Sequence, residues 1–323
     1  MTATSGVMNS QIMPPPVQLN YALKLLATPT PSYVYRFPAM TKIMPARSGR
    51  VLRMRRYNPL PTTPVQITDT GAEPPNTVGS VVDVDAEVKY FAQTMAISQQ
   101  VVLSSQDEVL NGWSIRMAVS LRGTEDTVIR NALVATASRV DAVGGANQDS
   151  PTQHGKIDFD TITSLFLEAN GLSLAERIGA EDEFGTSPQR NSYLMIAHSS
   201  IVRDLERTDG FVHRSQYPGG GGSVLPSEWG SVGSQRILLS TNASVSPKAS
   251  QAGRDVLNCI ATASEGYYIV KQSGFSSHFL YVPPEIASPR TRLYCSIGWR
   301  MATATSISSQ DWVINSRCTL SDF

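Results

Sequence analysis

Cysteine is scarce in this chain, and its distribution excludes a disulfide-stabilised scaffold. Only Cys259, Cys295 and Cys318 occur among 323 residues, and there is no CxxC pair. A disulfide framework needs an even set of cysteines at regular spacings, so we expect three buried free thiols instead.

Long apolar runs are missing as well. None reaches the ~18 residues that are needed to cross a bilayer. The first residues, MTATSGVMNSQIMPPP, do not show the basic-then-apolar order of a signal peptide. We therefore expect a protein with no membrane partner that is cytoplasmic when it is made.

Charged residues are few, and neither sign is in excess. Lys and Arg total 27, Asp and Glu total 27, and together they make up only 17% of the residues. Proteins dedicated to DNA binding usually carry a surplus of positive charge, because phosphate contacts supply much of their affinity. Low charge is instead typical of a subunit whose surface is covered by neighbours.

The sequence shows no constellation typical of an enzyme or a metal site. None of the four histidines lies in an HExxH motif or beside a cysteine at metal-binding spacing. The glycine-rich segment 218–223 is not followed by the Lys-Ser/Thr of a phosphate-binding loop, and GFSSH at 274–278 is not a Gly-x-Ser-x-Gly elbow. We expect no enzymatic activity, no cofactor and no metal.

What the N-terminal segment does contain is proline beside large apolar side chains. In residues 1–41, six prolines exclude a long helix or a central strand. A freely solvated tail does not carry so many large apolar groups. We predict an extended arm that lies on another surface of the same or a neighbouring subunit, with contacts made by Tyr21, Leu25, Tyr33, Tyr35 and Phe37.

Arginine is concentrated in one short segment with the alternation of a strand. Residues 47–57 read RSGRVLRMRRY and hold Arg47, Arg50, Arg53, Arg55 and Arg56, followed by Tyr57. Residues 81–90 alternate in the same way and place Asp83, Asp85 and Glu87 on one face.

The basic and acidic segments predict a long antiparallel hairpin. With Arg55 opposite Asp85, Arg53 falls opposite Glu87, so that both charged sets share one face. Arg47, Arg50 and Arg56 have no partner in this register and are candidates for ion pairs between subunits. A nucleic-acid contact made by the arginine cluster is the alternative.

A long helix is predicted from about residue 105 to 138. Ser105 and Glu108 have the spacing of a capping box, and apolar residues recur at steps of three and four, among them Trp113, Met117 and Leu121. At ~1.5 Å per residue the rod is on the order of 50 Å long. Gly123, the loop 143–156 and the segment 218–223 are candidate flexible joints. A shorter helix over 159–170 and a mixed region of strands from residue 191 follow.

The ordered motifs of this chain resemble those of a known family. They are KIMPARSGRVLRMRRYNPLPTTP (42–64), DVDAEVKYFAQTMAIS (83–98), AHSSIVRDLERTDGF (197–211), EWGSVGSQRILLSTNA (228–243) and IGWRMATATSI (297–307). In this order they resemble the major capsid proteins of tailed bacteriophages with the HK97 fold. More narrowly, they resemble the family related to the major capsid protein of phage N4.

The resemblance implies an α+β capsid fold with five parts. They are an N-terminal arm (1–41), an E-loop hairpin with flanking strands (42–98), a peripheral domain with the spine helix (99–175), an axial domain (176–300) and a C-terminal strand that returns to the peripheral domain (301–323).

The resemblance also implies a function. It implies a structural protein of the virion whose pentamers and hexamers form an icosahedral shell around double-stranded DNA. A portal is an implied partner, and a decoration or cement protein is an optional one. No long scaffolding extension precedes the arm, which favours a separate scaffolding protein over a processed N-terminus. An encapsulin-like compartment for cargo enzymes is the alternative with the same fold, and a nucleic-acid-binding protein is the alternative from another class.

Overall fold

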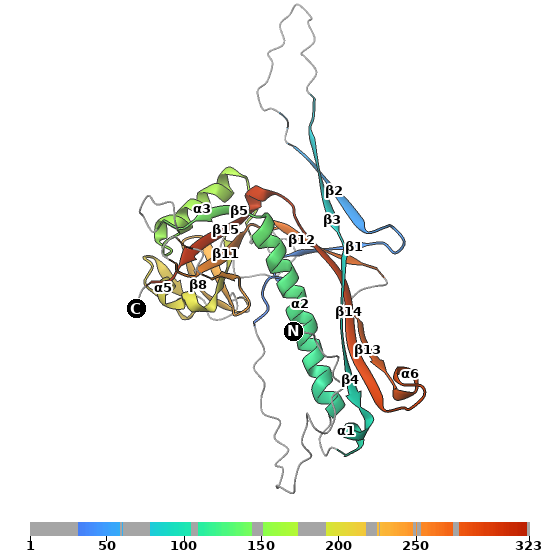
Figure 1. The fold of residues 1–323 in the computed structure, drawn as a ribbon. Helices are drawn as coiled ribbons and strands as arrows, with labels where there is room; N and C mark the ends of the chain where they lie inside the picture. Colours follow the sequence, from blue (N-terminus) through green and yellow to red (C-terminus); the bar gives the residue numbers. More distant parts are fainter. Residues whose placement is uncertain are drawn as a thin grey trace, which may run out of the picture.

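The computed structural model describes most of the chain, and Figure 1 shows its fold. The described residues are 32–58, 60, 78–104, 109–143, 151–173, 192–217, 225, 227–247, 250, 253–273 and 278–321. The predicted arm contacts of Tyr21 and Leu25, the capping box of Ser105 and Glu108, and the glycine-rich segment 218–223 lie outside them.

The molecule is elongated, with a compact part on one side and a long narrow sheet on the other (Figure 1). The narrow sheet has five strands in the order β1-β12-β14-β13, and β4 pairs with the other edge of β14. The strands are β1 (Met40–Met44), β4 (Lys89–Ser98), β12 (Tyr267–Gln272), β13 (His278–Val282) and β14 (Tyr294–Ile307).

The two faces of β14 pack against different partners because its side chains alternate. Ile297, Trp299 and Met301 lie in one buried cluster with Met117 of the long helix α2 (Val109–Thr136). On the opposite face, Ala302 and its neighbours join the cluster at the root of the hairpin. One long strand therefore holds the helix and the hairpin on opposite sides of a single layer.

The predicted long helix is present as α2, and it runs the length of the narrow sheet (Figure 1). The short α1 (Gln99–Ser104) precedes it, and α6 (Pro284–Ala287) lies at the same end of the sheet. Gly123 does not interrupt α2. A side-chain carbon at this position would lie only 2.9 Å from the Tyr33 hydroxyl oxygen, so glycine leaves room for that ring. No helix among the described residues is long and apolar enough to span a bilayer.

The compact part is built on an eight-stranded sheet in the order β5-β15-β11-β6-β9-β8-β7, with β10 also paired to β11. Its strands are β5 (Ser138–Asp141), β6 (Tyr193–His198), β7 (Phe211–His213), β8 (Glu228–Val232), β9 (Gln235–Ser240), β10 (Val245–Ser246), β11 (Val256–Thr262) and β15 (Val313–Thr319). Helix α3 (Lys156–Glu168) covers one face through Phe159, Ile162 and Phe166, and α5 (Val202–Glu206) lies nearby.

The two sheets divide the chain differently from the five expected parts. Residues 267–307, expected mainly in the axial domain, form β12, β13 and β14 of the narrow sheet. The C-terminal strand β15 pairs with β5, from the expected peripheral domain, and with β11, from the expected axial domain. Between the end of β14 at Ile307 and the start of β15 at Val313, the chain passes from the narrow sheet to the compact sheet.

The predicted hairpin is present as a separate two-stranded sheet. β2 (Val51–Tyr57) pairs antiparallel with β3 (Val81–Glu87) and extends away from the body (Figure 1). After Val88 the chain continues directly into β4 of the narrow sheet. The hairpin is therefore a continuation of a body strand.

Candidate functional site

The exposed face of the hairpin carries a ladder of arginine–aspartate pairs. Arg53 lies opposite Asp85 and donates from Nε to Oδ1 at 2.7 Å and from Nη2 to Oδ2 at 2.8 Å. Arg55 lies opposite Asp83, with Nε 2.8 Å from Oδ1. Two-point pairing of this kind fixes the direction of the guanidinium as well as its charge.

The predicted register was wrong by two residues, although the predicted faces are correct. Val51, not Arg53, lies opposite Glu87, and Arg55 lies opposite Asp83, not Asp85. A shift of two residues keeps every side chain on its face because the side-chain period of a strand is two. Alternation therefore identified the faces but could not choose between registers that differ by two.

Two of the arginines expected to be unmatched have partners within the chain. Arg50, just before β2, lies 3.4 Å from Glu87. Arg56 points to the other face and donates to the backbone oxygen of Ser308 at 3.4 Å. Arg47 adopts a positive φ of 66° in the turn that precedes β2. Most of the cluster is thus engaged by the protein itself.

The ladder is exposed, whereas the opposite face of the hairpin is anchored. The arginine hydrogen bonds lower the pKa values of Asp83 and Asp85, so both carboxylates stay ionised at neutral pH. Ala86 and Val88 are buried at the root against Met44 of β1, while Tyr57, at the outer end of β2, is 74% exposed. The hairpin has a fixed base and an accessible outer part.

The described part of the N-terminal segment packs on α2. Tyr35 is fully buried, and its backbone N–H donates to Oδ1 of Asp126 at 2.9 Å. The hydroxyl of Tyr267 on β12 donates to the backbone oxygen of Tyr35, and the Tyr33 hydroxyl donates to the oxygen of Val119 at 3.3 Å. This contact lies within one subunit.

Asp126 ties the N-terminal segment to both α2 and the compact sheet. Its Oδ2 accepts from Asn242 Nδ2 at 2.9 Å, and Asn242 in turn accepts from Arg130. Burial raises the pKa of Asp126, while the hydrogen bonds from Asn242 and Tyr35 act in the opposite direction. The preceding residue, Glu125, lies 2.8 Å from Lys271 and 3.4 Å from Arg36.

Apolar side chains are exposed at the end of the narrow sheet that carries α6 (Figure 1). Phe279, Leu280 and Tyr281 are successive residues of the edge strand β13, and each is 45–50% exposed. Ile286 and Leu293 are exposed beside them at 71% and 64%. A strand exposed on both faces is unusual for a free surface, and exposed apolar groups of this size mark interaction sites.

The remaining predicted residues of α2 lie on its inner side. Met117 is buried, and Trp113 and Leu121 are half-buried against the same cluster. The thiols of Cys259, Cys295 and Cys318 are free and buried, as expected. The structure also gathers His154, Cys259 and Cys318, a cluster that the sequence did not reveal because the three residues are far apart in the chain.

Neither a protein-family model nor a curated protein sequence matches the chain. Solved structures do match, and they define the class of fold as that of a phage capsid chain. The chain superimposes on the capsid of Ralstonia phage GP4 with a TM-score of 0.70 and 9% identity, covering 95% of this chain and 96% of that one.

Two other capsids are similar over nearly their full length. The cyanophage P-SCSP1u capsid gives a TM-score of 0.61 at 12% identity, covering 99% and 97% of the two chains. The head of Helicobacter pylori phage KHP40 gives 0.61 at 9% identity, covering 98% of each. The expected α+β fold of the HK97 capsid type is thereby confirmed. The narrower resemblance to the N4 family stays a prediction.

Proposed function

We propose that this chain is the major capsid protein of a tailed bacteriophage. Copies assemble through pentameric and hexameric rings into an icosahedral shell that encloses double-stranded DNA. The observation that carries the proposal is the full-length likeness to phage capsid chains at TM-scores up to 0.70. The projecting hairpin supports the proposal, because its outer part lies away from the subunit core and can pack only against another molecule.

Three surfaces are suited to repeated contacts between copies. They are the outer hairpin with its exposed Tyr57, the N-terminal segment with its exposed Phe37, and the exposed apolar strand β13. Contacts between different surfaces of identical subunits form a closed ring when the rotations from each copy to the next add up to a full turn. Each interface can be modest, because many of them act together in a shell.

The proposal carries further partners and a location. The protein resides in the virion capsid, after synthesis in the host cytoplasm, and has no enzymatic role. A separate scaffolding protein guides assembly, a portal occupies one vertex, and a decoration protein is a possible addition. The internal pairing of Arg50, Arg53 and Arg55 argues against the alternative of a dedicated nucleic-acid-binding protein.

Assembly is the direct test. The purified protein, alone and with the co-expressed scaffold of its own phage, is examined by size-exclusion chromatography with light scattering and by negative-stain microscopy. Rings or closed shells are the expected result. A 35.0 kDa monomer under every condition would contradict the proposal.

The contents of the particles separate the alternatives. Particles isolated from infected cells should hold DNA and show the high 260/280 absorbance ratio of nucleic acid. Particles filled with protein would favour the encapsulin-like compartment. Duplex binding by the unassembled subunit with a steep salt dependence would favour the nucleic-acid-binding alternative.

A further inference from the structure

Three potential metal ligands meet in the core of the compact sheet. The ligand atoms of His154, Cys259 and Cys318 all lie within 4.8 Å of one another, and the two sulfurs are 4.0 Å apart. Both cysteines are fully buried and His154 is 5% exposed. The third cysteine, Cys295, lies in the narrow sheet and does not belong to this cluster.

The central strands place the two thiols on one face. Cys259 of β11 lies opposite Ser316, and Cys318 of β15 lies opposite Leu257, so the cysteines are diagonal neighbours across the strand pair. Diagonal side chains on one face of an antiparallel pair are within reach of each other. The approach of the sulfurs is therefore set by the register of the central strands.

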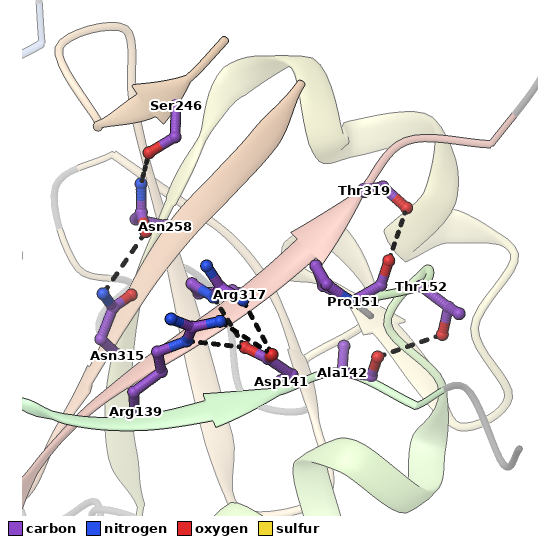
Figure 2. A network of polar contacts seen from close by, with 10 residues as sticks. All are labelled: Arg139, Asp141, Ala142, Pro151, Thr152, Ser246, Asn258, Asn315, Arg317 and Thr319. Atoms are coloured by element: carbon purple, nitrogen blue, oxygen red, sulfur yellow. Dashed lines mark hydrogen bonds and ion pairs between the residues drawn. The ribbon is translucent and has the colours of Figure 1, made fainter. Parts of the chain in front are cut away.

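Polar contacts hold Pro151 and Thr152, which precede His154 in the chain, to Thr319 and Ala142 (Figure 2). Thr152 donates from its backbone N–H to Ala142 at 2.8 Å, and Thr319 of β15 donates to Thr152 at 2.9 Å. Asp141 of β5 accepts from Arg317 of β15 at 2.6 Å. The segment before α3 is thus tied to the strand that contains Cys318.

Neither ring nitrogen of His154 makes an ordinary hydrogen bond among the residues that the structure describes, and the Cys259 thiol is a polar neighbour of the ring. A neutral imidazole carries one N–H donor and one acceptor nitrogen, and leaving both unpaired in a protein core costs free energy. The ring also packs against Phe159 with centroids 5.2 Å apart, which limits its freedom to turn elsewhere. A ligand for the imidazole would remove this cost.

The electrostatic surroundings favour a cation between the thiols. Asp158 and Asp204 add negative potential at Cys318. Their carboxylates are already held by backbone N–H groups, Asp158 by Gly155 and Asp204 by Ser321, so they act on the site through charge.

We propose that His154, Cys259 and Cys318 bind a Zn²⁺ ion that fastens the C-terminal strand to the core of the subunit. Zinc binds thiolate at about 2.3 Å and imidazole at about 2.0 Å, which for a tetrahedral site places two sulfurs about 3.8 Å apart. The observed 4.0 Å is close to that separation. Thiolate and imidazole together are a ligand set that zinc prefers over magnesium or calcium.

Charge balance makes such a site compatible with a core. Binding releases the two thiol protons to solvent, and the two thiolates then neutralise the two positive charges of the ion. A neutral cluster avoids most of the cost of burying an isolated charge. Three protein ligands leave a fourth position for a water molecule.

A pocket lies beside the cluster at His154. It has a volume of about 330 Å³ and is lined on one side by Gln153, His154 and Gly155 and on the other by Asp204 and Thr208. His154 is thus shared by the pocket and the thiol cluster.

Zinc content and zinc-dependent melting test the proposal on the full-length, unassembled subunit. The protein is produced in zinc-supplemented medium, desalted and analysed by mass spectrometry for metal per chain. One zinc per chain is expected in the wild type and in Cys295→Ser, the matched control for loss of a buried thiol. Cys259→Ser, Cys318→Ser and His154→Ala should lose the metal.

Two further measurements guard against variants that lose zinc by misfolding. Addition of Zn²⁺ to the metal-free protein should raise the melting temperature of the wild type and Cys295→Ser but not of the three ligand variants. Replacement by Co²⁺ should give thiolate-to-metal charge-transfer absorption in the wild type. A folded wild-type protein that takes up no zinc and shows no zinc-dependent shift overturns the proposal. So would a disulfide between Cys259 and Cys318, detected as a loss of two hydrogens in the intact mass.

Discussion

Replacing Tyr35 by alanine should show how strongly the N-terminal segment holds the subunit together. Tyr35 is fully buried in a cluster that joins three parts of the molecule. Ile129 and Leu133 come from α2, Ile260 from β11 and Val313 from β15. The side chain therefore packs at the junction between the long helix and the compact sheet.

The size of the effect follows from this burial. An aromatic side chain removes roughly 150–250 Å² from water, which at about 25 cal/mol/Å² corresponds to about 4–6 kcal/mol before the surroundings relax. Partial relaxation and the methyl group that alanine retains reduce this figure to the about 3–5 kcal/mol typical of large aromatic-to-alanine changes. We expect Tyr35→Ala to lower the free energy of unfolding by that amount.

Urea unfolding of the unassembled subunit, followed by tryptophan fluorescence, measures the change. The matched control is Phe37→Ala, two residues away in the same segment, where the ring is 42% exposed. We expect a loss of about 1 kcal/mol or less for this control. Equal losses for the two variants would refute the assigned burial of Tyr35. A defect in assembly without loss of stability in Phe37→Ala would place that ring between subunits.

Three further perturbations test other parts of the structure. Arg55→Asp should reduce the yield of shells without changing the melting temperature of the subunit, and adding Asp83→Arg to the same chain should restore the yield. If the yield were restored instead by a change to Arg at another acidic residue of β3, the observed register would be refuted. Arg236→Ala should cost about 3–5 kcal/mol of stability in urea unfolding, because Glu228 is 1% exposed and would keep a buried charge without its cation; a cost of under 1 kcal/mol would contradict this pairing. The pKa of Asp126 in the folded protein lies above its ordinary value of 3.8, so ionisation of this carboxyl destabilises the fold. The protonated carboxyl contributes most to the free energy of unfolding below pH 3.8, and this contribution is lost as the pH rises through the folded-state pKa. Unfolding free energies across this range should therefore shift in favour of Asp126→Asn as the pH rises, and a constant difference would contradict the raised pKa.

The hairpin shows how much of a structure the alternation of side chains in a strand can predict. Alternation alone gave the charged face and the apolar face of β2 and β3, because side chains point to opposite sides at every step. It did not give the pairing of Arg53 with Asp85, because registers two residues apart satisfy the same alternation. The packing of Ala86 at the root of the hairpin is a tertiary contact that alternation does not specify.

The compact sheet shows what a sequence pattern does not predict, namely which strands pair. Its central strand β11 carries no alternation that would mark it in the sequence, since every residue is buried. The pairing of β15 with β11 and β5 could not be predicted from its sequence either. A strand that could pair with any of several edges carries no local sign of which one it joins.

The sequence by itself determined the elements whose signal is local: the long helix from its apolar spacing, the two faces of the hairpin from alternation, and the free thiols from the scarcity of cysteine. Tertiary structure alone decided which distant segments meet. The backbone of Tyr35 bonds to Asp126 across 91 positions, and Cys259 approaches Cys318 across 59. Contacts at such separations depend on how whole layers pack, and the residues next to each partner in the sequence do not predict that packing.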